Sequence, residues 1–169
     1  MSRSQDQTNN LSLLAGGHLP DPTEGPSSRL LEVFPNAYPL RSYLICIDFP
    51  EFTSLCPVTG QPDFGRIHVA YIPDKLCVES KSFKLYMFAF RRHQSFMETI
   101  TNTVLDDLCL VMDPCWLRVE GLFVPRGGTR ISVFAEHIKD ESSERMQKVA
   151  RIAAEYRTDC HAAKYAYGC

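Results

Sequence analysis

Apolar side chains recur at every fourth position through the middle of the chain. The repeat consists of Phe96, Ile100, Val104, Leu108 and Met112. This spacing places the side chains on one face of an α-helix, and the Asp-Pro pair at 113–114 ends the pattern because proline cannot continue a helix. We therefore predict an amphipathic helix over 95–112, whose apolar face must be buried against another layer.

Strand-like segments lie on both sides of this helix. Before it, 42–50 and 66–73 are rich in β-branched and aromatic residues and end in proline. After it, 116–124 and 130–135 flank a Pro-Arg-Gly-Gly turn at 125–128. These compositions and boundaries are typical of β-strands.

The segment 79–92 is compatible with a helix or a strand. It lacks Gly and Pro and is dense in Lys, Leu, Met, Phe and Ala, which favours a helix, although Phe83, Leu85 and Met87 alternate as in a strand. We expect a helix, which makes the element order β-β-α-α-β-β. That order predicts an α+β fold in which two helices are layered on an antiparallel four-stranded sheet.

The two ends of the chain differ from this core. Residues 1–40 are polar and rich in Gly, Pro, Ser and Asn, so we expect an extended N-terminal arm with only short local structure. The apolar residues of 143–156 gather on one helical face and predict an additional C-terminal helix. We therefore divide the chain into an arm (1–40), a central domain (41–137) and a helical extension (138–169).

Charge and composition narrow the function. A net charge of −2 without a cluster of Lys and Arg argues against a nucleic-acid groove. No apolar run approaches the ~20 residues that cross a bilayer. The 7 cysteines form no C-x-x-C pair, and the N-terminal residues include no apolar signal region, which indicates reduced thiols in the cytoplasm. We expect a small-molecule substrate, with neither nucleic acid nor membrane as partner.

One turn-rich segment, 51–65, combines a thiol with a carboxyl group. It contains Cys56 and Asp63, and between them Gly60 and Pro62 disfavour regular structure. We expect strand or helix to be unlikely here, so that the segment is a loop joining two strands. Such loops often carry chemistry, although a half-buried cysteine and an aspartate that forms its own turn would explain the same residues.

This segment resembles the nucleophile loop of the 7-cyano-7-deazaguanine reductase family, the nitrile reductases of queuosine biosynthesis. Residues 78–86, Val-Glu-Ser-Lys-Ser-Phe-Lys-Leu-Tyr, are similar to that family's NADPH-associated motif and lie at the expected distance downstream. The turn at 125–128 and the Phe-Pro-Asn at 34–36 support the resemblance, which covers roughly 11–134.

The resemblance implies a tunnelling fold and an oxidoreductase. Members of the family use NADPH to reduce the nitrile of 7-cyano-7-deazaguanine to an aminomethyl group in this tRNA-modification pathway. Their subunits form rings whose sheets join into a barrel, with substrate pockets at subunit boundaries. A chain with a single motif set suggests a homo-oligomer of two stacked pentamers, and the open edges of a small sheet favour such pairing.

The family's catalytic positions match Cys56 and Asp63. A thiolate at Cys56 would add to the nitrile carbon and form a thioimide, which hydride attacks more readily than a bare nitrile. Asp63 would give a proton to the nitrile nitrogen, a role that requires a carboxyl group still protonated near neutral pH.

The substrate-binding positions of the family match two places in the sequence. Glu98 carries two acceptor oxygens that suit the ring N–H and amino group of a deazaguanine, whereas its alternative role is a first-turn acid favoured by the helix dipole. Val78, Glu79 and Ser80 match the other substrate contacts. For Glu79 the alternative is again an acid at a helix N-terminus.

The chain departs from the family at Met97. Family members usually carry Phe-His-Glu where this chain reads Phe-Met-Glu at 96–98. Methionine cannot donate a hydrogen bond or transfer a proton, although it fills space against a ring, so Met97 is kept as a substrate contact. His93 is a candidate substitute for the missing imidazole, and its alternative role is that of a surface or capping residue.

NADPH is implied by the resemblance alone, because the chain has no G-x-G-x-x-G after a strand. Lys81 and Lys84 lie in the NADPH-associated motif, and on a helix their i,i+3 spacing puts them on one face, where they could hold phosphate oxygens. Arg126 in the glycine-rich turn is a weaker candidate. A solvated charged face is the alternative for all three residues.

Other activities are compatible with parts of the pattern. An amidine-forming transferase of the same fold also forms the thioimide but delivers ammonia, and the intact motif at 79–86 argues against it. A zinc cyclohydrolase would need Cys and His ligands at workable spacing, and none is visible, so no metal is expected. The missing imidazole at 97 leaves open a protein that binds the nitrile covalently but reduces it poorly.

Overall fold

A four-stranded antiparallel sheet lies at the centre of the computed structural model, which describes residues 25–140 and 142–166, with side chains through Thr158. Its strands are, in spatial order, β2 (Ile45–Leu55), β3 (Pro62–Ile72), β5 (Trp116–Phe123) and β6 (Ser132–Ile138). Residues 1–24, most of the expected arm, lie outside the described residues.

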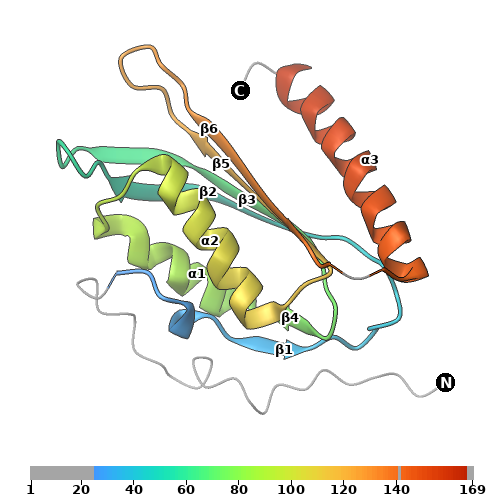
Figure 1. The fold of residues 1–169 in the computed structure, drawn as a ribbon. Helices are drawn as coiled ribbons and strands as arrows, with labels where there is room; N and C mark the ends of the chain where they lie inside the picture. The colour runs from blue at the N-terminus through green and yellow to red at the C-terminus, as the bar shows by residue number, and fades with distance from the viewer. Residues whose placement is uncertain (1–24, 141, 167–169) are drawn as a thin grey trace.

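Helices cover both faces of this sheet (Figure 1). On one face lie α1 (Ser80–Ala89), a short 3-10 turn η3 (Phe90–Arg92), and α2 (Met97–Met112). On the other lies α3 (Glu144–Ala166). The predicted α+β fold with two helices layered on an antiparallel four-stranded sheet is therefore confirmed, and α3 continues well beyond the predicted helix at 143–156.

The central strand β3 explains why both faces are covered. Ile67, Val69 and Tyr71 are almost fully buried in the large core beneath α1 and α2. The alternate residues Ala70 and Ile72 are equally buried, but they pack in a second core against α3. Because successive side chains of a strand point to opposite faces, one buried strand supports both layers.

Strands β2 and β3 extend further into 51–65 than the sequence predicts. β2 continues to Leu55 and β3 begins at Pro62, so only 56–61 connect the two strands. The expectation that a strand is unlikely across the whole segment is therefore wrong. The functional turn is shorter, and better supported by sheet hydrogen bonds, than the sequence suggests.

A bulge at Pro50 explains why β2 is longer than the sequence predicts. The sequence analysis ends the first strand at Pro50, yet β2 passes through it because the register with β3 shifts between Phe49 and Phe52. A bulge leaves a residue out of the regular ladder, and β2 is an edge strand with one unpaired side. Both features accommodate a residue that lacks an N–H donor.

A second, two-stranded sheet was not predicted. Its strands are β1 (Val33–Pro35) and β4 (Leu76–Val78). A 3-10 turn, η2 (Ser28–Leu30), precedes β1. Each has only 3 residues, too few to show an alternating pattern. The pair joins the end of the N-terminal arm to the segment that leads into α1.

Gly121 in β5 sets how closely α2 approaches the sheet. A Cβ at this position would lie 2.4 Å from Thr101 Oγ1 and 2.7 Å from a ring carbon of Phe123. We expect Gly121→Ala to destabilise the protein by about 1–3 kcal/mol, because α2 or Phe123 must move to admit the methyl group. Thermal unfolding measures the loss, and adding Thr101→Ala should recover part of it. An unchanged unfolding temperature would contradict this close packing.

The described helices include none with the length and apolar character needed to cross a membrane.

Candidate active site

Cys56 opens the tight connection between β2 and β3. Its N–H donates to the carbonyl of Gln61 (2.8 Å), and its carbonyl accepts from the N–H of Gly60 (2.9 Å). Gly60 has a φ of +68°, a conformation that glycine adopts without strain. These bonds fix the backbone of Cys56, whose residue surface is only 8% exposed.

The surroundings of Cys56 favour its thiolate. Hydrogen bonds from the Thr59 hydroxyl, from the N–H groups of Thr59 and Val58, and from Arg126 lower the pKa of the Cys56 thiol to about 7, against a small opposing effect of burial. A large fraction of the thiol is therefore ionised near neutral pH. Sequence reasoning missed Thr59, whose position three residues after a cysteine in a closed turn is the signal that could have found it.

Asp63 lies near the start of β3, directly across from Ser54 of β2. Its side chain is only 3% exposed, and Arg126 Nε lies 3.0 Å from its Oδ1. No described group donates a hydrogen bond to Oδ1, so the contact with Arg126 is an ion pair. Arg126 also lowers the pKa of the Cys56 thiol, so one guanidinium interacts with both the thiol and the carboxyl group.

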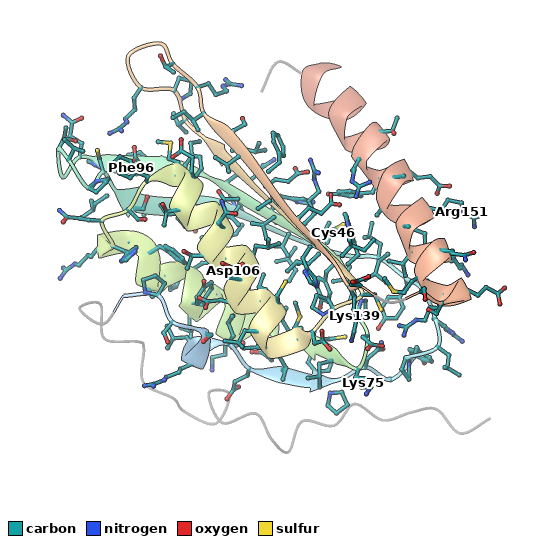
Figure 2. All side chains as sticks on the ribbon, viewed as in Figure 1. Cys46, Lys75, Phe96, Asp106, Lys139 and Arg151 are labelled. Atoms are coloured by element: carbon teal, nitrogen blue, oxygen red, sulfur yellow. The ribbon has the colours of Figure 1, made fainter. Side chains whose placement is uncertain are left out.

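The start of α2 is held beside Cys56. The N–H of Leu55 donates to the carbonyl of His93 (3.0 Å), and the N–H of Ser95 donates back to the carbonyl of Leu55 (3.1 Å). Figure 2 shows Phe96 at the end of α2 next to the β2–β3 hairpin tip, with Asp106 further along the helix. The next two residues, Met97 and Glu98, therefore emerge at the Cys56 end of the molecule.

Met97 and Glu98 differ in exposure. Met97 is only 7% exposed and belongs to the main core, whereas Glu98 is exposed in the first turn of α2.

His93 is not positioned like a free proton carrier. Burial lowers its pKa, its ring packs edge-on against Phe90, and its carbonyl is the acceptor for Leu55.

Glu79 lies at the N-terminus of α1 and caps it. Its carboxylate accepts from the N–H groups of Lys81 (2.8 Å) and Ser82 (2.7 Å), while Ser80 Oγ lies 3.3 Å away. Between this cap and the Leu55–His93 contact run the 10 residues of α1 and then η3. Ten helical residues span about 15 Å. A single chain therefore does not bring 78–80 to Cys56.

The three candidate cofactor residues do not share one place. Lys81 and Lys84 are exposed on α1, one turn apart. Arg126 instead projects from the β5–β6 turn onto Asp63. Among the described residues, no group of three or more His, Cys, Asp and Glu side chains could hold a metal ion.

Comparisons with known proteins give the family. A family model described as QueF-like protein matches residues 62–142. A protein of Desulfovibrio desulfuricans named NADPH-dependent 7-cyano-7-deazaguanine reductase is 67% identical over 89% of this chain and 90% of its own length. Proteins with the same name from Nitratidesulfovibrio vulgaris and Neisseria meningitidis are 59% and 46% identical, over 94% and 82% of this chain and 95% and 88% of theirs.

A solved structure of the apo form of an archaeosine synthase, also described as QueF-Like, matches the fold with a TM-score of 0.54. It is 20% identical, and the match covers 58% of this chain and 96% of that one. This likeness concerns the fold alone, and it confirms the tunnelling fold. The sequence relatives show that the chain belongs to the family of NADPH-dependent 7-cyano-7-deazaguanine reductases.

Proposed function

We propose that this protein reduces the nitrile of 7-cyano-7-deazaguanine to an aminomethyl group with NADPH, in queuosine biosynthesis. The names of its relatives support the reaction. The arrangement that carries the assignment of the site is the Cys56 thiol, fixed in a closed turn, beside the buried Asp63 carboxyl group that Arg126 contacts.

Cys56 is the proposed nucleophile, and Asp63 is the proposed proton donor. The thiolate adds to the nitrile carbon, and Asp63 delivers a proton to the nitrogen, which gives a neutral thioimide. Because the Asp63 side chain is only 3% exposed, water competes little with the substrate at this carboxyl group. Two hydrides and one further proton would then convert the thioimide to the amine, and the sulfur–carbon bond would break, which returns the Cys56 thiolate for another cycle.

NADPH supplies the hydrides when it is bound. Lys81 and Lys84 fit a polyanionic cofactor, since both are exposed on one helix and are separated by one turn. We propose that these two lysines hold its phosphates. Arg126 is retained as a weaker contact, because it already lies on Asp63.

We propose that the substrate pocket forms between copies of the chain. Met97 and Glu98 would contact the deazaguanine from the Cys56 side, with the Glu98 carboxylate accepting from its ring N–H and amino group. Val78, Glu79 and Ser80 would come from a neighbouring copy, since they lie at the far end of α1. The sheet order leaves one edge each of β2 and β6 unpaired among the described strands, which favours a homo-oligomer, with two stacked pentamers as the expected form.

Co-expression of two inactive variants tests the shared pocket. Cys56→Ala and Glu79→Gln should each be inactive or severely impaired alone, and the glutamine retains an acceptor for the α1 cap. If each pocket combines two copies, random mixing should restore roughly a quarter of the wild-type activity per site. NADPH oxidation by the purified mixture measures it. Absence of any recovery would place Glu79 and Cys56 in the same chain's site or outside a common pocket.

Met97→His tests the departure from the family. If the missing imidazole limits proton transfer, the variant should oxidise NADPH about tenfold faster, which corresponds to only ~1.4 kcal/mol of barrier. Met97→Leu keeps an apolar side chain of similar size and should show no gain. Steady-state rates between pH 6 and 8 provide the measurement. No gain at any pH would mean that Met97 is a packing residue and that protons arrive by another route.

Turnover is the direct test of the proposed function. Purified protein should oxidise NADPH only when 7-cyano-7-deazaguanine is present, and mass spectrometry should find the aminomethyl product. Capture of the nitrile without NADPH oxidation would instead support a nitrile binder with impaired reduction. The five cysteines whose side chains the structure describes form no disulfide, which supports our proposal that the protein works in the cytoplasm.

A further inference from the structure

Arg126 contacts both groups of the proposed catalytic pair. Its Nε lies 3.0 Å from Asp63 Oδ1, and its interaction with the Cys56 thiol lowers the pKa of that thiol. The other contacts recorded at Cys56 come from Thr59 and Val58, which are uncharged. Arg126 is thus the charged group that these contacts place against both the thiol and the carboxyl group.

The β5–β6 turn fixes where Arg126 starts. The N–H of Arg126 donates to the carbonyl of Thr129 (3.1 Å), and the N–H of Thr129 donates back to the carbonyl of Arg126 (3.0 Å). The two residues between them, Gly127 and Gly128, have φ values of +56° and +80°. Two consecutive residues of positive φ are typical of the tight hairpin turn whose twist matches the flanking strands. The guanidinium is therefore presented from a defined backbone position.

We propose that Arg126 is a positioning residue that holds the Cys56 thiol and the Asp63 carboxyl group together before substrate binds, with one proton shared between the two groups. The role of Arg126 in nitrile reduction rests on the function proposed above. A buried carboxylate is costly without a compensating cation, and Asp63 Oδ1 receives no hydrogen bond from any described group. The guanidinium stabilises the negative charge on whichever of the two groups has given up the shared proton.

Proton balance gives this arrangement a role in thioimide formation. When a thiol adds to a nitrile, a sulfur–carbon bond forms, one π bond of the nitrile breaks, and the proton that leaves sulfur ends on nitrogen. No electron is gained or lost overall. Asp63 is able to accept the Cys56 proton and then pass it to the nitrogen. Arg126 thereby holds Asp63 beside Cys56 for the first transfer, and Asp63 acts as the donor to nitrogen in the second.

The pH dependence of Cys56 alkylation tests the proposal without nitrile or NADPH. Rates of iodoacetamide labelling, assigned to Cys56 by peptide mass spectrometry, are measured between pH 5 and 10. Arg126→Gln should raise the midpoint by about one pH unit, and Arg126→Lys should retain part of the wild-type shift. Arg130→Gln is the matched control, because it removes an exposed charge just beyond the same turn and should leave the midpoint unchanged.

Two results would overturn the role of Arg126. One is a wild-type midpoint in a folded Arg126→Gln protein, with folding checked by its unfolding temperature. The other is an equal shift in Arg130→Gln, since the net charge of the turn would then explain the change in the alkylation midpoint without a specific role for Arg126. Failure of the proposed nitrile reduction would leave this measurement intact, because alkylation reports the thiol alone.

Discussion

Cys56→Ala should abolish NADPH-dependent nitrile reduction, with a loss on the order of 10⁴-fold or more, as expected when a covalent nucleophile is removed. Without the sulfur there is no thioimide, and hydride must attack the bare nitrile. The fold should survive, because Cys56 lies in the connection between β2 and β3, outside the two main cores. Steady-state NADPH oxidation and the unfolding temperature are the two measurements.

Cys46→Ala is the matched control for this loss. Cys46 is another cysteine outside any disulfide and lies in β2, the same strand that leads into the Cys56 turn. Its removal should leave turnover near the wild-type value. Substantial turnover in Cys56→Ala would mean that the nitrile is reduced without covalent capture, and the assignment of the nucleophile would be wrong.

Asp63→Asn should lower turnover by about 10²-fold or more, the usual scale for loss of a general acid or base. Asparagine keeps the shape of the side chain but cannot carry the proton, and it removes the charge that faces Arg126. The decrease should appear in kcat, with a smaller change in KM, because Asp63 is assigned to the chemistry and Glu98 to recognition of the base.

Asp48→Asn serves as the control for Asp63. Asp48 also lies on the β2–β3 hairpin, but it is 44% exposed and pairs with Arg66, away from the Cys56 turn. The control should retain nearly full turnover. If Asp63→Asn does the same, Asp63 takes no part in proton transfer and its contact with Arg126 is structural.

The elements with a long regular pattern could be predicted from the sequence. The i+4 repeat predicted α2, which the structure begins at Met97, and β-branched composition located the four strands of the central sheet. Short or irregular elements could not. β1 and β4 show no period, and the strand through Pro50 depends on a bulge whose position is set by pairing with β3.

The candidate site was predictable only where its residues are close in the sequence. Cys56 and Asp63 belong to one short segment, so their meeting followed from a single turn. Arg126 was assigned to the cofactor, because its contact with Asp63 depends on the spatial order β3-β5-β6, which brings the β5–β6 turn to the same end of the sheet. The separation of Glu79 from Cys56 likewise depends on the direction in which α1 runs.

Intact-protein mass spectrometry tests covalent capture most directly. The protein is incubated with 7-cyano-7-deazaguanine in the absence of NADPH, so that the reaction cannot proceed beyond the thioimide. We expect the wild-type protein to gain the full mass of one substrate molecule per chain, and Cys56→Ala to gain none. An adduct that persists in Cys56→Ala, or a wild-type protein that turns over substrate without ever forming the adduct, would contradict the mechanism.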